Sequence, residues 1–226
     1  MSQDLRPRSI IGPLNIYSFL ALAGVVGPIV LVMANLTASF SVPGYNLIRD
    51  SISSLAWTPI GWLQSIGFLI TGLLVEVFAV GLLFSIRGAR GFRLGIGLLV
   101  FFGFGLLLFG AFREDPVGSL HTIQGTIHTI TAATAFSIFP IASLLIALSL
   151  RKDSYWKGLF PHTIAMTGLA SAFVIGHLCV AAKLSWFGLY ERILVANTVI
   201  WVEIMAVRLL RLSLGAGERL KRPTIF

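Results

Sequence analysis

The stretch LGIGLLVFFGFGLLLFGAF, residues 94–112, contains no charged side chain. A helix needs about 20 mostly apolar residues to cross a hydrocarbon core of about 30 Å. The run is continuous and does not alternate between apolar and polar residues, which indicates a helix instead of a strand of a membrane barrel. The sequence therefore predicts a transmembrane helix at residues 94–112.

Five more runs of this kind occur in the chain, at residues 13–36, 61–86, 122–150, 161–182 and 192–210. Charged residues make up 12% of the sequence and the mean hydropathy is +0.90, whereas a soluble domain carries about 25% charged residues. We expect an all-α fold in which residues 1–226 form a single polytopic membrane bundle of six transmembrane helices, with a flexible basic tail at residues 215–226.

The basic residues are distributed unevenly over the predicted connections. One side of the membrane receives 13 of the 17, namely Arg6, Arg8, Arg87, Arg90, Arg93, Arg151, Lys152, Lys157, Arg208, Arg211, Arg219, Lys221 and Arg222. The other side receives Arg49, Arg113, Lys183 and Arg192. Because basic connections stay in the cytoplasm, both termini are predicted to be cytoplasmic in a plasma-membrane protein. The net charge of +8 thus reflects topology and a lipid bilayer partner, and no nucleic-acid partner is expected.

The connection after the first helix is long and predicts a short amphipathic helix on the outer side. Pro43 and Gly44 indicate a turn, and Asn46 is a candidate N-cap. Ile48, Ile52 and Leu55 then fall on one apolar face. The alternative is an interfacial helix without any site.

The junction FREDPVGSLHTIQGTIHTI, residues 112–130, concentrates polar groups between two apolar helices. Ser119 is the expected N-cap of the second of these helices. The residues His121, Gln124, His128 and Thr131 follow at helical spacing, and Gly125 beside them allows a neighbour to approach closely. Because such a stripe is costly against lipid, it is predicted to line an outward-facing polar pocket.

Further polar groups are expected near the same pocket. His177 lies toward the outer end of the fifth helix, and Tyr190, Glu191 and Arg192 precede or begin the sixth. No cofactor is required, although His128, His177 and Asp115 are candidate ligands for a divalent metal. The alternative is a hydrogen-bonded and ionic network that pairs Asp115 or Glu114 with Arg49 or Arg192, and the histidines with Ser and Thr hydroxyls.

Two acids, Glu76 and Glu203, lie inside predicted membrane helices. A carboxyl group there is costly unless it is protonated or paired, so each is a candidate functional residue. The alternative for each is a neutral side chain that bonds to a neighbouring helix.

Several short motifs are similar to those of domain-of-unknown-function family 998, which comprises six-span bacterial and archaeal membrane proteins. The matching stretches are PGYNLIRDSISSLAW, FREDP with HTIQGTIH, and GLYERI. The residues that carry the resemblance are Tyr45, Ser51, Ser53, Leu55, Asp115, Pro116, Gly125, His128, Gly188, Leu189 and Arg192. Ser54 stands where the family often has Asp. The resemblance implies the six-helix topology and a shared outer site, and it implies no activity.

Three functions are consistent with these residues. The first is binding of a lipid headgroup or small polar ligand in the outer pocket, with Arg49, Arg113 and Arg192 holding an anionic group. Its expected residues are Tyr45, Arg49, Ser51, Ser53, Asp115, His121, Gln124, His128, His177 and Arg192. The second is a membrane hydrolase in which Ser53 or a metal-bound water attacks, His128 is the base and Asp115 orients it or binds metal. The third is a proton-coupled transporter that uses Glu76 and Glu203.

Overall fold

The computed structural model describes residues 14–116, 118–179 and 184–215, and this part of the chain contains helices and no strand. The long helices are α1 (Ile16–Ser41), α2 (Gly61–Ser85), α3 (Phe92–Ala111), α4 (Ile123–Leu150), α5 (Phe160–Cys179) and α6 (Phe187–Leu214). Two short 3-10 helices, η1 (Ser53–Trp57) and η2 (Lys157–Leu159), lie in connections. All six long helices are long and apolar enough to cross a membrane, so the predicted all-α, multi-pass fold is confirmed.

The predicted boundaries differ from the observed ones at two helices above all. Helix α1 continues to Ser41, beyond the predicted end at residue 36, because Ala38 and Ser39 are buried against the bundle. Helix α6 begins at Phe187, five positions before the predicted start. The predicted end of the fifth helix at residues 180–182, Lys183, and residues 216–226 of the basic tail lie outside the described residues.

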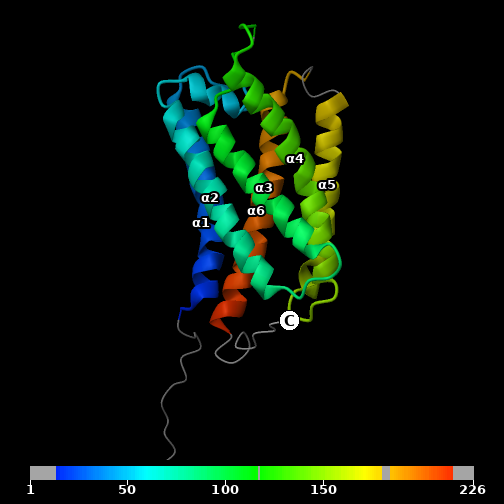
Figure 1. Cartoon of the computed structure of the whole chain (residues 1–226). Helices are drawn as coiled ribbons and strands as arrows, with labels where there is room; N and C mark the ends of the chain where they lie inside the picture. The colour runs from blue at the N-terminus through cyan, green and yellow to red at the C-terminus, as the bar shows by residue number, and fades with distance from the viewer. Residues whose placement is uncertain (1–13, 117, 180–183, 216–226) are drawn as a thin grey trace, which may run out of the picture.

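Successive helices pack side by side, and α6 returns to lie against α1 (Figure 1). Helix α5 packs mainly on α4 and less closely on α6. The beginning of α1 and the end of α6 lie at the same end of the bundle, which we call the terminal end (Figure 1). The opposite end carries the α1–α2 and α3–α4 connections, and we call it the loop end.

Close helix packing depends on small residues and on aromatic rings. A Cβ atom on Gly72 of α2 would lie 2.7 Å from the carbonyl oxygen of Gly103 on α3, so these backbones touch. Phe139 of α4 packs against Phe102 of α3 and Trp201 of α6, with ring centroids 5.2 and 5.5 Å apart. This aromatic layer fixes α3, α4 and α6 relative to one another beneath the loop end.

Candidate functional site

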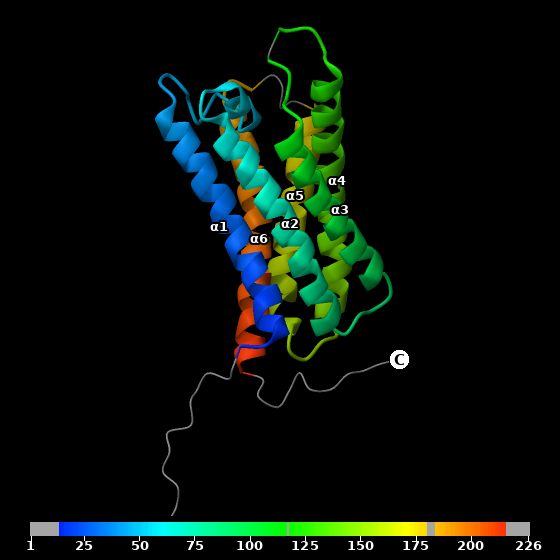
Figure 2. The same ribbon diagram turned by 60° about the vertical axis from the view of Figure 1, so that its left-hand side comes forward.

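The α1–α2 connection folds over the loop end of the bundle instead of extending into solvent (Figure 2). It turns at Gly44, whose φ of 78° suits glycine. Asn46 Oδ1 accepts hydrogen bonds from the backbone N–H groups of Ile48 (2.9 Å) and Arg49 (3.2 Å), as a cap would. The predicted amphipathic helix does not continue from this cap. A turn follows, then η1, and Ile52 and Leu55 are buried whereas Ile48 is 54% exposed.

The amphipathic helix does not form because four consecutive carbonyl groups of this connection bond to the start of α6. The carbonyls of Ile48 and Arg49 accept from the N–H groups of Leu189 (2.9 Å) and Gly188 (3.2 Å). Those of Leu47 and Asp50 accept from Arg192 Nη1, at 2.9 and 2.8 Å. The first N–H groups of a helix have no partner within the helix, and here the connection supplies partners for two of them. These contacts account for the early start of α6 at Phe187.

Arg192 is a structural clamp rather than an open anion site. In addition to its Nη1 contacts, its Nη2 donates to the Tyr45 hydroxyl (2.5 Å), and the guanidinium lies 5.5 Å from the centre of that ring. The Tyr45 hydroxyl donates in turn to the carbonyl of Ser51 (2.6 Å). Burial raises the pKa of Tyr45 above its ordinary value, so the hydroxyl keeps its proton.

The other two outer guanidiniums have partners different from those of Arg192. Arg49 Nε bonds to Asp50 Oδ1 at 2.6 Å, and this guanidinium lowers the pKa of Asp50. Arg113 lies over the ring of Trp57, 5.7 Å from its centre. That Arg49, Arg113 and Arg192 hold one anion stays a prediction, and each guanidinium has contacts of its own within the protein. Neither Glu114 nor Asp115 forms the expected ion pair with Arg49 or Arg192 within the described residues.

His128 and Ser53 form a hydrogen-bonded pair between α4 and the start of η1. Ser53 Oγ lies 3.0 Å from His128 Nε2, and His128 Nδ1 lies 2.9 Å from the carbonyl oxygen of Phe112. Because a carbonyl can only accept, Nδ1 carries a proton. In the neutral ring Nε2 then has the free lone pair and accepts the proton of the Ser53 hydroxyl. The contacts thus select one tautomer of a buried imidazole.

Asp115 belongs to the start of α4. Its Oδ2 accepts from the N–H of Thr122 (2.9 Å) and its Oδ1 from the Thr122 hydroxyl (2.6 Å), and these bonds lower the pKa of Asp115. The Thr122 hydroxyl caps the helix by accepting from the N–H of Gly125 at 3.0 Å. Thr122 is therefore the N-cap in place of the predicted Ser119, whose hydroxyl bonds to the carbonyl of Pro116.

The predicted polar stripe on α4 is wrong for its first half. His121 precedes the helix with a side chain that is 96% exposed, and Gln124 is exposed too. His128 is buried and Thr131 is half-buried. Gly125 does admit a close neighbour, since a Cβ there would lie 2.1 Å from the Asp115 carboxyl group. The stripe divides because α4 begins at Ile123, so His121 does not share its helical face.

A cavity of about 150 Å³ lies where α4, α5 and α6 meet beneath the α1–α2 connection. Its polar lining consists of Ser53, Glu114, His128, Thr129, Ser137, His177, Tyr190 and Glu191. Its apolar lining consists of Ala132, Ala133, Phe136, Val174, Phe187 and Leu194. The His177 ring lies 6.0 Å from that of Phe187 and 6.4 Å from that of Tyr190, which orients it on this wall.

The profile of a family described as protein of unknown function, DUF998, matches residues 25–208. The chain belongs to the DUF998 family. No curated protein and no solved structure matches it.

The residues that suggested this DUF998 membership gather at the loop end. Tyr45, Gly188 and Arg192 join the α1–α2 connection to α6, and a Cβ on Gly188 would lie 2.2 Å from the carbonyl oxygen of Asp50. Ser51 Oγ donates to Glu114 Oε2 at 3.3 Å and accepts from the N–H of Ser54 at 3.1 Å. The motif residues thus hold this end together, and two of them, Ser53 and His128, also line the cavity.

The donors expected to bind a metal do not fit one. Both ring nitrogens of His128 have hydrogen-bond partners, and both oxygens of Asp115 accept from Thr122. His177 lines the cavity from α5. In residues 14–116, 118–179 and 184–215 no three His, Cys, Asp or Glu side chains are grouped as metal ligands would be.

Two acids at the site were expected nearby but were missing from the predicted ligand-binding residues. Glu191 Oε2 accepts from the N–H of Ile52 at 2.6 Å, and Glu114 accepts from Ser51 and, through its carbonyl, from Trp57 Nε1 at 2.6 Å. The sequence signal for Glu191 was its position beside Arg192, at the start of the sixth helix. A carboxylate near a helix start is favoured by the helix dipole.

The two intramembrane acids are not part of this site. Glu76 packs against Gly103, where α2 meets α3. Glu203 lies on α6 with Arg208 and Arg211 near the terminal end, and its Oε2 has no hydrogen-bond partner within the described residues.

Proposed function

We propose that this DUF998 protein binds an amphipathic ligand, with a hydrogen-bonding head and an apolar tail, in the cavity between α4, α5 and α6. The observation that carries the proposal is that the cavity is lined by both polar and apolar side chains. His177, Glu191 and the Ser53–His128 pair provide polar groups, whereas Phe136, Val174 and Leu194 provide an apolar wall. Ligand sites typically combine a mostly apolar lining with a few polar groups that orient the ligand.

The charges of the lining favour a head that donates hydrogen bonds. Glu114 and Glu191 contribute carboxyl groups, and among the described residues no guanidinium lines this cavity. A phosphate would face acids there, whereas a hydroxyl or ammonium group would find acceptors. The proposed ligand is therefore a lipid or small amphiphile with a hydroxyl- or amine-bearing head.

The loop end is proposed to face away from the cytoplasm, across the plasma membrane. The terminal end contains Arg87, Arg90, Arg93, Arg151 and Lys152. Such a basic excess marks the cytoplasmic side. The ligand would then enter from the outer leaflet or the outer medium.

The variant His177→Phe tests this function. Phenylalanine keeps an aromatic ring against Phe187 and Tyr190 but removes both ring nitrogens, and no hydrogen bond to His177 is lost within the described residues. We expect native mass spectrometry of the purified protein to show a bound amphiphile that is depleted in His177→Phe. The control His121→Phe changes an exposed histidine outside the cavity. Equal occupancy in both variants would refute the proposal.

The Ser53–His128 pair favours a second candidate function, hydrolysis of an ester or amide. Ser53 Oγ would add to the carbonyl carbon while its proton passes to His128 Nε2. The leaving group would depart with that proton, and water would release the acyl group by the reverse transfer. Phe112 would hold the imidazole through its carbonyl, the part given to Asp115 in the sequence-based hypothesis.

A fluorophosphonate reagent distinguishes this second function from simple binding. An activated Ser53 would form a phosphonate adduct that mass spectrometry locates, and His128→Gln would abolish it. Ser54→Ala is the control, because the Ser54 hydroxyl bonds to the carbonyl of Ser51 instead of a histidine. Absence of an adduct on Ser53 in the natural protein would contradict hydrolysis while leaving ligand binding intact.

A further inference from the structure

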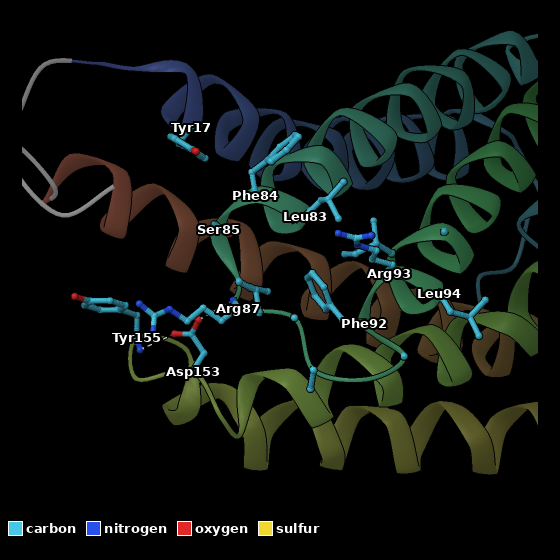
Figure 3. Close-up of a pocket in the computed structure, with 16 residues that line it drawn as sticks. Tyr17, Leu83, Phe84, Ser85, Arg87, Phe92, Arg93, Leu94, Asp153 and Tyr155 are labelled. Atoms are coloured by element: carbon cyan, nitrogen blue, oxygen red, sulfur yellow. Dashed lines mark hydrogen bonds between the residues drawn. The ribbon is translucent and has the colours of Figure 1, made fainter. Parts of the chain in front are cut away.

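A second and larger cavity lies at the terminal end, opposite the site described above. Its volume is about 1320 Å³, and it is bordered by the start of α1, the end of α2, the α2–α3 connection and residues of the α4–α5 connection. Tyr17, Arg87, Arg93, Asp153 and Tyr155 are among its lining side chains (Figure 3). It shares no residue with the cavity at the loop end.

The negative charge in this cavity is already satisfied by the protein. Asp153 is 3% exposed, and its Oδ2 accepts from the N–H of Arg87 at 2.9 Å. Its Oδ1 accepts from the N–H of Tyr155 at 2.8 Å. Asp153 therefore serves to tie the α2–α3 connection to the α4–α5 connection. Its carboxylate is almost completely buried and accepts from these two backbone N–H groups.

The positive charge is exposed and available. Arg87 and Arg93 are exposed, and neither has a carboxylate within salt-bridge distance in the described part of the chain. Figure 3 shows Arg87 on the side of Asp153 and Tyr155, with Arg93 farther along the cavity near Leu83. Guanidinium groups with free donors are well suited to phosphate oxygens, and the Tyr17 and Tyr155 hydroxyls add further donors.

The cavity is also bordered by apolar side chains that no other described residue covers. Phe84 is 66% exposed and Leu94 is 60% exposed, and both line the cavity. In a membrane-spanning bundle such side chains contact acyl chains. Basic groups beside an apolar border at a helix end are the arrangement that binds anionic headgroups.

We propose that the terminal-end cavity binds the phosphate of an anionic phospholipid headgroup, with Arg87 and Arg93 as its charged contacts. Phe84 and Leu94 provide the surface for the acyl chains. This site is independent of the ligand proposed for the loop end, and it selects the opposite head chemistry.

The test is displacement of a fluorescent phosphatidylglycerol from the full-length protein in detergent micelles. We expect Arg87→Gln/Arg93→Gln to weaken binding of the probe by at least about tenfold, because two charge-assisted contacts are lost. The control Arg90→Gln/Arg151→Gln removes the same charge from exposed positions that do not line the cavity, and it should change affinity by less than about twofold. Thermal unfolding without lipid should be the same for both double variants.

Competitors identify the chemistry that is recognised. Unlabelled phosphatidylglycerol should displace the probe, and diacylglycerol, which lacks the phosphate, should not. If inorganic phosphate alone displaces the probe, the site binds a soluble phosphate compound. If inorganic phosphate does not displace the probe, the site binds a lipid. The proposal is overturned if the two double variants lose affinity equally, if neither loses affinity, or if diacylglycerol competes as well as phosphatidylglycerol.

Discussion

Arg192 determines the shape of the loop end, because its guanidinium contacts three backbone carbonyls and one phenol. Nη1 donates to the carbonyls of Leu47, Asp50 and Gly188, and Nη2 donates to Tyr45. No pattern in the sequence distinguishes an arginine that binds carbonyls from one that binds a ligand. The residue type and its location at the loop end could be predicted, whereas its partners Tyr45, Leu47 and Asp50, 142 to 147 positions earlier in the chain, required the fold.

Substitution Arg192→Ala should therefore reduce stability. The carbonyls of Leu47 and Asp50 would lose a charged donor, which costs about 2–4 kcal/mol in the free energy of unfolding. Arg49→Ala, whose side chain is 66% exposed and pairs with Asp50, should cost less than about 1 kcal/mol. Unfolding in detergent, followed by circular dichroism against denaturant, measures both. Equal effects of the two variants would contradict the clamp.

Asp115 should make the stability of the loop end depend on pH. Its bonds from Thr122 favour the carboxylate and lower its pKa, so its contribution is present above the ordinary pKa and is lost as pH falls through the lowered value. Asp115→Asn should be less stable than the natural protein at about pH 6, and the difference should shrink toward about pH 3. Asp50, whose pKa is also lowered, titrates in both proteins and cancels from this difference. A difference that stays constant with pH would show that Asp115 does not act through its charge.

At the scale of elements, the long apolar runs predicted all six helices. A continuous apolar run inside a bilayer satisfies its backbone hydrogen-bonding groups by forming a helix. The connections were harder to predict. The α1–α2 connection has the apolar spacing of a helix at Ile48, Ile52 and Leu55, yet the carbonyls of residues 47–50 bond to α6. A helix start in another part of the chain competes for these groups, and local patterns contain no information on that competition. The same contacts explain why α6 begins at Phe187 instead of the predicted residue 192.

Packing of α2 on α3 gives a prediction with an internal control. Gly72→Ala would place a Cβ 2.7 Å from the carbonyl oxygen of Gly103, so the helices must separate, at a cost of about 1–3 kcal/mol. Gly97→Ala, also in this pair of helices, meets no atom within 4 Å. It should be neutral or stabilise α3 by up to about 1 kcal/mol, because alanine favours the helix. Denaturant titration of both variants checks this, and a loss of stability in Gly97→Ala would contradict the packing described.

For the whole molecule, the proposed orientation can be tested by cysteine labelling. In a Cys179→Ser background, Ser119→Cys marks the loop end and Ser154→Cys the terminal end, and both positions are exposed. If the loop end faces outward, a membrane-impermeant maleimide will label position 119 in intact cells and position 154 after permeabilisation. The reverse pattern would invert the topology and place the proposed ligand site in the cytoplasm.

Helix α5 packs less closely on α6 than on α4, and the cavity is lined by residues of all three helices. The sequence predicted a polar recess with His128 and His177 near one end. The residues that line it come from three helices and from the α1–α2 and α3–α4 connections. These residues come together only because α5 packs against α4 in this orientation. The apolar faces of the helices do not specify that orientation.

The most direct test of the proposed ligand site fills this cavity without removing a polar group. Ala133 lines the cavity, so Ala133→Trp should occupy its space, whereas Ile130, which is 61% exposed outside the cavity, provides the control Ile130→Trp. Native mass spectrometry of the purified proteins should find the bound amphiphile in the natural protein and in Ile130→Trp, and not in Ala133→Trp. Equal occupancy in all three proteins would contradict the account.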